Sequence, residues 1–195
     1  RHNLVKKQTR CKNQIKSLLH FYGKSIPEEM VLSHWSRRYI QELENIRMER
    51  PAGATALQTL LSELIYLRDL IAHSTREMIA LSRTEDYREW VQLFKTIPGI
   101  STLCAMTLLT ELVDISRFST FDHLACYVGF IPNIHDSGEK ERHTGLTTRR
   151  NPALRTLLIE AAWITVRKDP AMMMAFNHLC VRMKKTRAII HIAKK

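Results

Sequence analysis

The sequence is poor in the residues that break regular structure, with six Gly and six Pro among 195 residues. This scarcity excludes a turn-dense all-β sandwich, whose tight turns need these residues. No apolar run is as long as the roughly 18 residues that a transmembrane helix needs. The opening residues also contain no apolar stretch of signal-peptide length. We therefore expect a cytoplasmic protein that is not bound to a membrane.

The sequence also lacks a recognisable metal or disulfide pattern. Its four cysteines are scattered and form no C-x-x-C pair, and the histidines show no ligand spacing with one another or with a cysteine. Together with the missing signal, this pattern favours reduced thiols over a disulfide framework. No Gly-rich phosphate loop occurs. We therefore predict neither a metal site nor a cofactor within this chain.

Positive charge is what the sequence has in excess. The chain holds 30 Lys and Arg against 19 Asp and Glu, for a formal net charge of +11. Residues 1–24 hold seven basic and no acidic residues, and residues 138–195 hold thirteen basic and four acidic residues. The stretch between them is net acidic. Two basic ends favour contact with a polyanion, nucleic acid before an acidic protein or a membrane surface.

The most regular apolar pattern lies in the third predicted helix, after helices at 4–22 and 33–48. Spacings of three and four alternate from Leu57 to Leu81, as in a coiled-coil seam or a long helical hairpin. With Thr55 as N-cap and no break before Pro98, the helix would have about 40 residues and span roughly 60 Å. Such an arm spaces two active parts or pairs with a second copy. The predicted seam is Leu57, Leu60, Leu64, Leu67, Ile71, Ser74, Met78 and Leu81.

Shorter helices are predicted from residue 93 onward. Ser101, Asn151-Pro152 and Asp169-Pro170 each combine features that start helices. Residues 129–150 form the longest polar connection, and no segment alternates well enough to predict a strand. The predicted fold is all-α, with a basic helix and coiled-coil arm in residues 1–92 and a compact multi-helix domain in residues 93–195.

Two segments of the second domain could carry function. Pro98-Gly99 lies between two apolar residues and two helices, with Ser101 at the next helix start, as in a helix-hairpin-helix whose backbone N–H groups bind a DNA phosphate. A plain helix–helix corner, with Ile97 and Ile100 in the core, explains these residues equally well.

The second segment is the polar loop around Asp136-Ser137-Gly138. A serine beside a glycine can present its hydroxyl, and Asp136 or His135 could accept the proton. Nearby arginines could neutralise the developing charge, and turn chemistry alone also explains the three residues. The arginines are Arg142, Arg149, Arg150 and Arg155.

Taken in order, these motifs resemble the insertion-sequence transposases related to Piv-type DNA invertases, a group that includes the bridge-RNA-guided recombinases. The resemblance covers about residues 93–195. It is carried by residues 93–101 and 118–132, Ser137-Gly138, Arg142, Gly145, Asn151-Pro152-Ala153-Leu154-Arg155 and Asp169-Pro170.

The resemblance implies a three-part protein. An N-terminal RNase H-like (RuvC-like) domain with acidic ligands for Mg²⁺ would precede this chain, and a coiled-coil insertion and a C-terminal domain with a catalytic serine would lie within it. Ser137 matches that nucleophile. The sequence departs from the family's usual residues at two places. Asp136 replaces a serine that is frequent in relatives, and Arg149-Arg150-Asn151 replaces a Lys-Gly-Asn motif.

We therefore predict the C-terminal portion of a DNA transposase that cuts and rejoins DNA through Ser137, with an isolated chain that binds nucleic acid but is inactive. Expected partners are DNA, a structured guide RNA and a second copy through the coiled coil. The alternatives are a free-standing helix-hairpin-helix binder without chemistry and a coiled-coil oligomerisation module. The predicted nucleic-acid-binding residues are Pro98, Gly99, Ser101, Arg142, Arg149, Arg150 and Arg155.

Overall fold

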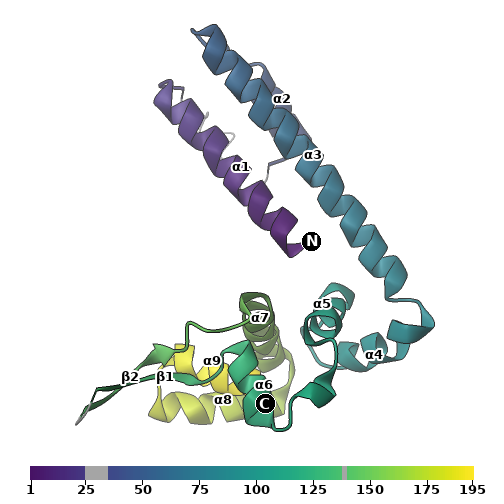
Figure 1. The fold of residues 1–195 in the computed structure, drawn as a ribbon, viewed down its shortest axis with the longest axis vertical. Coiled ribbons are helices and arrows are strands. Elements are labelled where there is room, and N and C mark those ends of the chain that lie inside the picture. The colour runs from purple at the N-terminus through teal and green to yellow at the C-terminus, as the bar shows by residue number, and fades with distance from the viewer. Residues whose placement is uncertain (25–34, 138–139) are drawn as a thin grey trace. The chain divides into compact units, whose positions relative to one another are not determined.

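The protein folds into two units, each with its own hydrophobic core. The computed structural model describes the backbone of residues 1–24, 35–137 and 140–195, and their side chains except those of 133–144. Unit 1 is Arg1–Glu77 and unit 2 is Met78–Lys195. Both are mainly helical (Figure 1), which confirms the helical character of the predicted fold. The domain boundary predicted after residue 92 stays a prediction.

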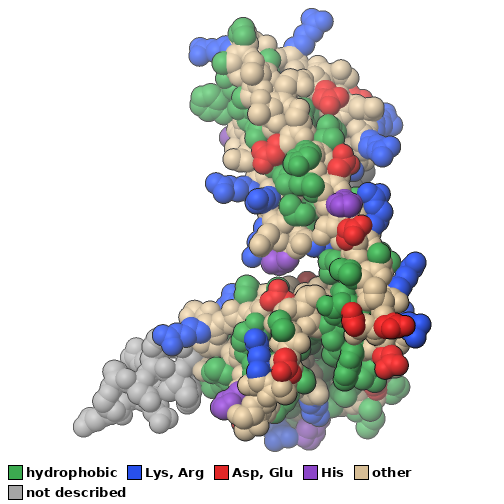
Figure 2. Space-filling model, turned by 45° about the vertical axis from the view of Figure 1, so that its right-hand side comes forward, with side chains coloured by type: hydrophobic (Ala, Val, Ile, Leu, Met, Phe, Trp, Pro, Cys, Tyr) green, Lys and Arg blue, Asp and Glu red, His purple; other side chains and the backbone are tan. Residues whose placement is uncertain are grey.

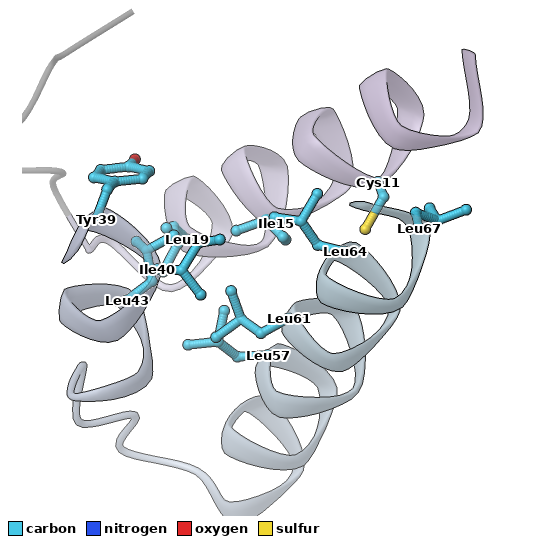
Figure 3. Packing of buried hydrophobic residues seen from close by; sticks show 10 residues of the cluster. All are labelled: Cys11, Ile15, Leu19, Tyr39, Ile40, Leu43, Leu57, Leu61, Leu64 and Leu67. Atoms are coloured by element: carbon cyan, nitrogen blue, oxygen red, sulfur yellow. The ribbon is translucent and has the colours of Figure 1, made fainter. Parts of the chain in front are cut away.

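Unit 1 is built on the antiparallel helices α1 (His2–Phe21) and α3 (Pro51–Leu81), with the short α2 (Arg37–Glu44) against them (Figure 1). Ser36 caps α2 by accepting a hydrogen bond from the Tyr39 N–H at 3.1 Å. Apolar side chains from the three helices meet in one core (Figure 3). Its members are Cys11, Ile15, Leu19, Tyr39, Ile40, Leu43, Leu57, Leu61, Leu64 and Leu67.

The first half of the predicted seam therefore packs within the chain. Leu64 is 0% exposed and points toward α1 beside Ile15 (Figure 3), a placement that fits the helical-hairpin interpretation. Farther along α3 the seam loses its cover, and Leu81 is 48% exposed. A coiled-coil pairing between copies stays a prediction.

The limits predicted for the third helix are wrong at both ends. The helix begins at Pro51, which suits a first helical position, and Thr55 lies inside it with its hydroxyl donating to the Pro51 carbonyl. The helix ends at Leu81 after 31 residues, and the next one, α4 (Glu85–Lys95), starts with Thr84 as N-cap. The physical reason is local, because Thr84 followed by acidic residues in the first turn favours a new helix start.

Unit 2 packs short helices around two neighbouring apolar clusters. Three predicted helix starts are confirmed: the Ser101, Asn151 and Asp169 side chains each accept a backbone N–H of the helix that follows. After α4 its elements are α5 (Thr102–Leu112), the 3₁₀ helix η2 (Ile115–Arg117), α6 (Phe121–Val128), α7 (Pro152–Lys168), α8 (Pro170–Arg182) and α9 (Lys185–Lys194).

The polar connection between α6 and α7 contains an antiparallel hairpin, so the prediction of no strand was wrong there. Strand β1 (Pro132–Ser137) pairs with β2 (Lys140–Leu146), from Pro132 opposite Leu146 to Ser137 opposite Lys140. The sequence conceals it because a two-stranded ribbon with polar residues on both faces shows no apolar alternation. Among the described residues, no helix is both long enough and apolar enough to cross a bilayer.

Candidate nucleic-acid interface

The start of α7 is tied to α5 and α6 by the Asn151 side chain. Its oxygen caps α7 by accepting the N–H groups of Ala153 and Leu154, each at 3.1 Å. Its Nδ2 donates to Glu111 Oε2 on α5 at 2.6 Å. The Asn151 backbone N–H donates to the Tyr127 carbonyl on α6 at 2.9 Å. One residue therefore fixes the end of the hairpin's return segment relative to three helices.

Hydrogen bonds among the described residues anchor the hairpin at its base. The Thr147 N–H donates to the Ile131 carbonyl at 3.0 Å, and Thr147 itself is buried. Its hydroxyl accepts the Arg149 N–H at 3.2 Å. Ser137 ends β1 opposite Lys140, at the far end of the ladder from this anchor. The side chains of Ser137 and Arg142 lie outside the described residues, as does the loop residue Gly138.

Three predicted binding residues come together at the N-terminus of α7. Arg149 and Arg150 are exposed, and Arg155 is half-buried one turn into the helix. The Arg155 guanidinium donates to the Thr147 carbonyl at 3.1 Å. Burial, and then the charge of Arg150, lowers the pKa of Arg155, although an arginine remains protonated at neutral pH.

The described side chains place no acidic partner on Arg150 or Arg155. Among the described side chains, neither Arg150 nor Arg155 forms a salt bridge. The helix N-terminus adds partial positive charge from the backbone N–H groups of α7. Because guanidinium groups carry several fixed donors, the arrangement suits a phosphate oxygen. The start of α7 is therefore the candidate anion site of unit 2.

Gly129 makes the close packing of this cluster possible. It ends α6 in the left-handed region with φ +91°, and a Cβ there would lie 2.4 Å from the Arg150 Cβ. Both the backbone conformation and the contact require glycine. The sequence locates this glycine but gives no reason to link it with Arg150, since the two lie on either side of the hairpin.

The structure adds a fourth arginine that sequence reasoning missed. The Arg117 guanidinium carbon lies 4.7 Å from the ring centroids of both Phe118 and Tyr127. The Tyr127 hydroxyl donates to the Glu111 carbonyl at 3.2 Å, which joins this stack to the network that holds Asn151. Only the adjacent Arg117-Phe118 pair hinted at it, and such pairs are common in sequences that form no stack.

The corner at Pro98-Gly99 packs against a different part of α7. The Thr165 hydroxyl donates to the Pro98 carbonyl at 2.6 Å. A Cβ on Gly99, whose φ is +97°, would lie 2.8 Å from the Ala161 carbonyl oxygen. Ile100 is buried, whereas Ile97 is 44% exposed.

The glycine of this corner is therefore explained by the approach of α7. Ala161 lies nine residues beyond Pro152, roughly 14 Å along the helix from its start, and six residues, roughly 9 Å, beyond Arg155. Hence the structure does not bring Pro98, Gly99 and Ser101 into the cluster with Arg149 and Arg150. Ser101 is used as the cap of α5, with its hydroxyl oxygen accepting the Cys104 N–H at 3.3 Å. Phosphate binding at this corner stays a prediction.

Metal ligands are not grouped in the described part of the chain. No three His, Cys, Asp or Glu residues converge there closely enough to hold an ion. The four cysteines are free thiols. What unit 2 brings together is positive charge and hydrogen-bond donors, a combination that suits a polyanion.

Proteins similar to this chain are insertion-sequence transposases. The transposase for insertion sequence element IS1111A of Coxiella burnetii is 29% identical over 204 residues, covering 100% of this chain and 54% of the relative. The transposase for insertion sequence element IS1328 of Yersinia enterocolitica is 26% identical over 168 residues, covering 85% of this chain and 47% of the relative. The chain thus spans about half the length of these curated relatives.

One segment of the chain also matches a family model. Residues 91–177 match the family described as Transposase IS116/IS110/IS902. The matched segment contains the Pro98-Gly99 corner, the hairpin and the arginine cluster at the start of α7. Residues 91–177 are therefore the part of the chain that is similar to this transposase family.

Proposed function

We propose that this chain is the DNA-reacting portion of an insertion-sequence transposase, and that the Ser137 oxygen attacks a DNA phosphodiester. The observation that supports it best is the arginine cluster at the start of α7, inside the segment that matches the transposase family. The cluster lies at the base of the hairpin that carries Ser137. The proposed partners follow from this chemistry: DNA as the substrate, and a structured guide RNA as a second polyanion.

The proposed step exchanges one phosphate ester for another. The Ser137 hydroxyl loses its proton to a base, for which His135 and Asp136 are candidates, and its oxygen forms a bond to phosphorus. The bond from phosphorus to one deoxyribose oxygen breaks, and that oxygen takes up a proton. The product is a phosphoserine diester, which the same chemistry in reverse rejoins to a DNA hydroxyl.

The arginines have a separate role in this proposal. Charge builds on the phosphate oxygens as the serine oxygen approaches, and fixed guanidinium groups stabilise that charge more in the transition state than in the ground state. Arg149 and Arg150 lie at the base of the hairpin, at the opposite end of the ladder from Ser137, so in this proposal they bind the DNA backbone beside the reacting phosphate, and Arg155 holds the return strand through Thr147. Arg142 would contribute from β2 itself.

Two further parts of the proposal concern the longer protein. Mg²⁺ would be held by acidic residues of a domain outside this chain, as the resemblance implies, so the isolated chain binds DNA without recombining it. Copies of the transposase would associate through the part of α3 beyond the core of unit 1, where Leu81 is 48% exposed.

The test uses the full-length transposase with DNA and Mg²⁺. Ser137→Ala should still bind DNA but form no covalent protein–DNA adduct and no recombinant product. Ser137→Cys should retain a trace of adduct, because a thiolate is a competent nucleophile of different size. Ser119→Ala is the matched control, since Ser119 is exposed and its hydroxyl contacts His123 within the same unit.

The results separate the proposal from its rivals. Normal recombination by Ser137→Ala would place the nucleophile elsewhere and leave the loop as a turn. DNA binding without adduct formation by the unmodified full-length protein would favour a plain binding protein.

A further inference from the structure

Unit 1 contains a cluster of cations from two helices that the transposase site does not use. Lys12 and Lys16 lie one turn apart on α1, and Arg68 lies on α3. Trp35 contacts two of the three: Lys12 Nζ lies 5.7 Å from its ring centroid, and the Arg68 guanidinium donates to its carbonyl at 2.6 Å. Two segments that are distant in sequence are therefore held together around one tryptophan.

The three cations are close enough to repel one another. Burial, and then the charges of Arg68 and Lys16, lowers the pKa of Lys12. No salt bridge to any of the three occurs among the described residues, although Asp69 follows Arg68 in the chain. Arg68 also lines a groove with Glu44 and Asp69, so its charge is partly balanced on that side. Repulsion between Lys12 and its two cationic neighbours lowers the stability of the folded unit, and an anion bound between them would relieve it.

The other basic residues of α1 add to the positive electrostatic potential around these three cations. Residues 1–24 hold seven Lys and Arg and no acidic residue. Lys6 and Arg10 lie on another side of the helix, where they line a separate groove with Phe21 and Leu60. The helix therefore presents a fixed cluster, where Lys12 and Lys16 meet Arg68, and a second group of cations away from it.

We propose that Lys12, Lys16 and Arg68 form a binding site in unit 1 for the phosphodiester backbone of nucleic acid. The proposal rests on the proposed function for one point only, the identity of the polyanion. A nucleic acid fits better than an acidic peptide because the cluster combines point charges with a guanidinium fork, and such sets bind closely spaced phosphates. Neighbouring phosphates along one strand would each meet one of these cations.

The test measures equilibrium binding of the full chain to a short DNA duplex and to an RNA hairpin, by fluorescence anisotropy at several salt concentrations. Lys12→Gln with Lys16→Gln should weaken binding about tenfold and reduce the slope of log affinity against log salt by about 2 for duplex DNA. Lys6→Gln with Arg10→Gln removes the same charge from the other side of α1. This matched control should weaken binding only about two- to threefold through the general field.

Several results would overturn the site. Equal losses for the two double variants would mean diffuse attraction without a site. Competition by poly-glutamate as effective as that by DNA, at equal charge concentration, would mean an acidic protein partner. If circular dichroism shows that the Lys12 variant is unfolded, Lys16→Gln alone serves, because Lys16 is exposed. The Lys16→Gln variant should bind nucleic acid about threefold more weakly than the unmodified chain. An unchanged affinity would also reject the site.

The two proposals fail separately. Ser137→Ala leaves unit 1 unaltered, so its binding to nucleic acid should match that of the unmodified chain whether or not Ser137 is the nucleophile. Arg149→Glu with Arg150→Glu should leave a residual binding that Lys12→Gln with Lys16→Gln removes. Absence of that residual binding would reject the unit 1 site and leave the serine chemistry untouched.

Discussion

The two units differ in how completely they cover their apolar side chains. Unit 1 closes most of them into one core between three helices (Figure 3). Unit 2 holds eleven of the fourteen large hydrophobic residues found exposed among the described residues, including Trp90, Leu93 and Val113. Hydrophobic side chains also reach the surface in the view of Figure 2. Yet unit 2 contains nearly all of the segment that matches the transposase family.

The comparison teaches that the strongest sequence pattern reports packing rather than function. The seam from Leu57 to Leu67 is regular because it must fill the core of unit 1. The residues of the proposed site, Arg149, Arg150 and Ser137, follow no periodicity, because they lie at a helix start and in a polar hairpin. Their sequence pattern is an ordered series of short motifs.

The largest effect is expected in the core of unit 1. Leu64 is 0% exposed, so Leu64→Ala should lower the free energy of unfolding by about 2–5 kcal/mol, and Leu64→Asp by more because it buries a charge. Ile65, which is 40% exposed, is the control, and Ile65→Asp should cost less than about 1 kcal/mol. Urea unfolding followed by circular dichroism measures both. A folded Leu64→Asp monomer derived from a wild-type dimer would show that the seam pairs between chains instead.

A smaller effect is expected where unit 2 packs its corner on α7. Gly99→Ala adds left-handed strain and a contact of 2.8 Å with a backbone oxygen, so it should destabilise by about 2–4 kcal/mol. Gly23 in unit 1 has φ +62° and nothing within 4 Å of an added Cβ, so Gly23→Ala should show the strain alone, about 1–2 kcal/mol. Thermal unfolding of the two variants measures the difference. Equal losses would mean that α7 does not press on the corner.

Removing one helix cap from each unit gives a third comparison of the stability of the two units. Asn151→Ala removes both the cap of α7 and the bond to Glu111, and should cost about 1–2 kcal/mol. Ser36→Ala removes only the cap of α2 in unit 1, and should cost about 1 kcal/mol or less. Asn151→Ala should also weaken DNA binding, since it loosens the segment that carries Arg149 and Arg150. Unchanged DNA affinity would separate the cap from the interface.

The smallest effect concerns pH in unit 2. The Ser116 hydroxyl and backbone N–H donate to Asp114 at 2.6 and 2.8 Å, and with the charge of Arg117 they lower the pKa of this exposed carboxyl. The folded state therefore favours the carboxylate. The stability it contributes is complete above the unfolded pKa and is lost as pH falls through the lowered folded pKa. An NMR titration of Asp114 tests this, and Ser116→Ala should raise that pKa towards the ordinary value; no change would exclude the hydrogen bond as its cause.

Local chemistry decided what could be predicted. The caps at Ser101, Asn151 and Asp169 were predicted correctly because a side chain and the next three residues suffice to form them. The break after Leu81 was missed because no Pro or Gly interrupts the sequence between it and Pro98. The hairpin was missed because neither of its polar strands shows an apolar alternation. Only the hydrogen bonds between the two strands define them, and these cannot be seen in the sequence.

In the candidate site, too, the local features could be predicted from the sequence and the contacts between distant segments could not. The gathering of Arg149, Arg150 and Arg155 follows from their short separation along the start of one helix. Contacts between distant segments could not be predicted, such as the stacking of Arg117 on Tyr127 or the approach of Ala161 to Gly99. They arise from how four helices pack, and no residue pattern in a single sequence encodes them.

The central claim is that Ser137 forms a covalent link to DNA, and mass spectrometry tests it most directly. The full-length transposase is incubated with its DNA and Mg²⁺, denatured, and digested with a protease and a nuclease. We predict a nucleotide-bearing peptide that contains Ser137, with the modification on the serine oxygen and absent from the Ser137→Ala protein. A nucleotide attached to another residue, or recombinant DNA formed without any protein-linked nucleotide, would contradict the claim.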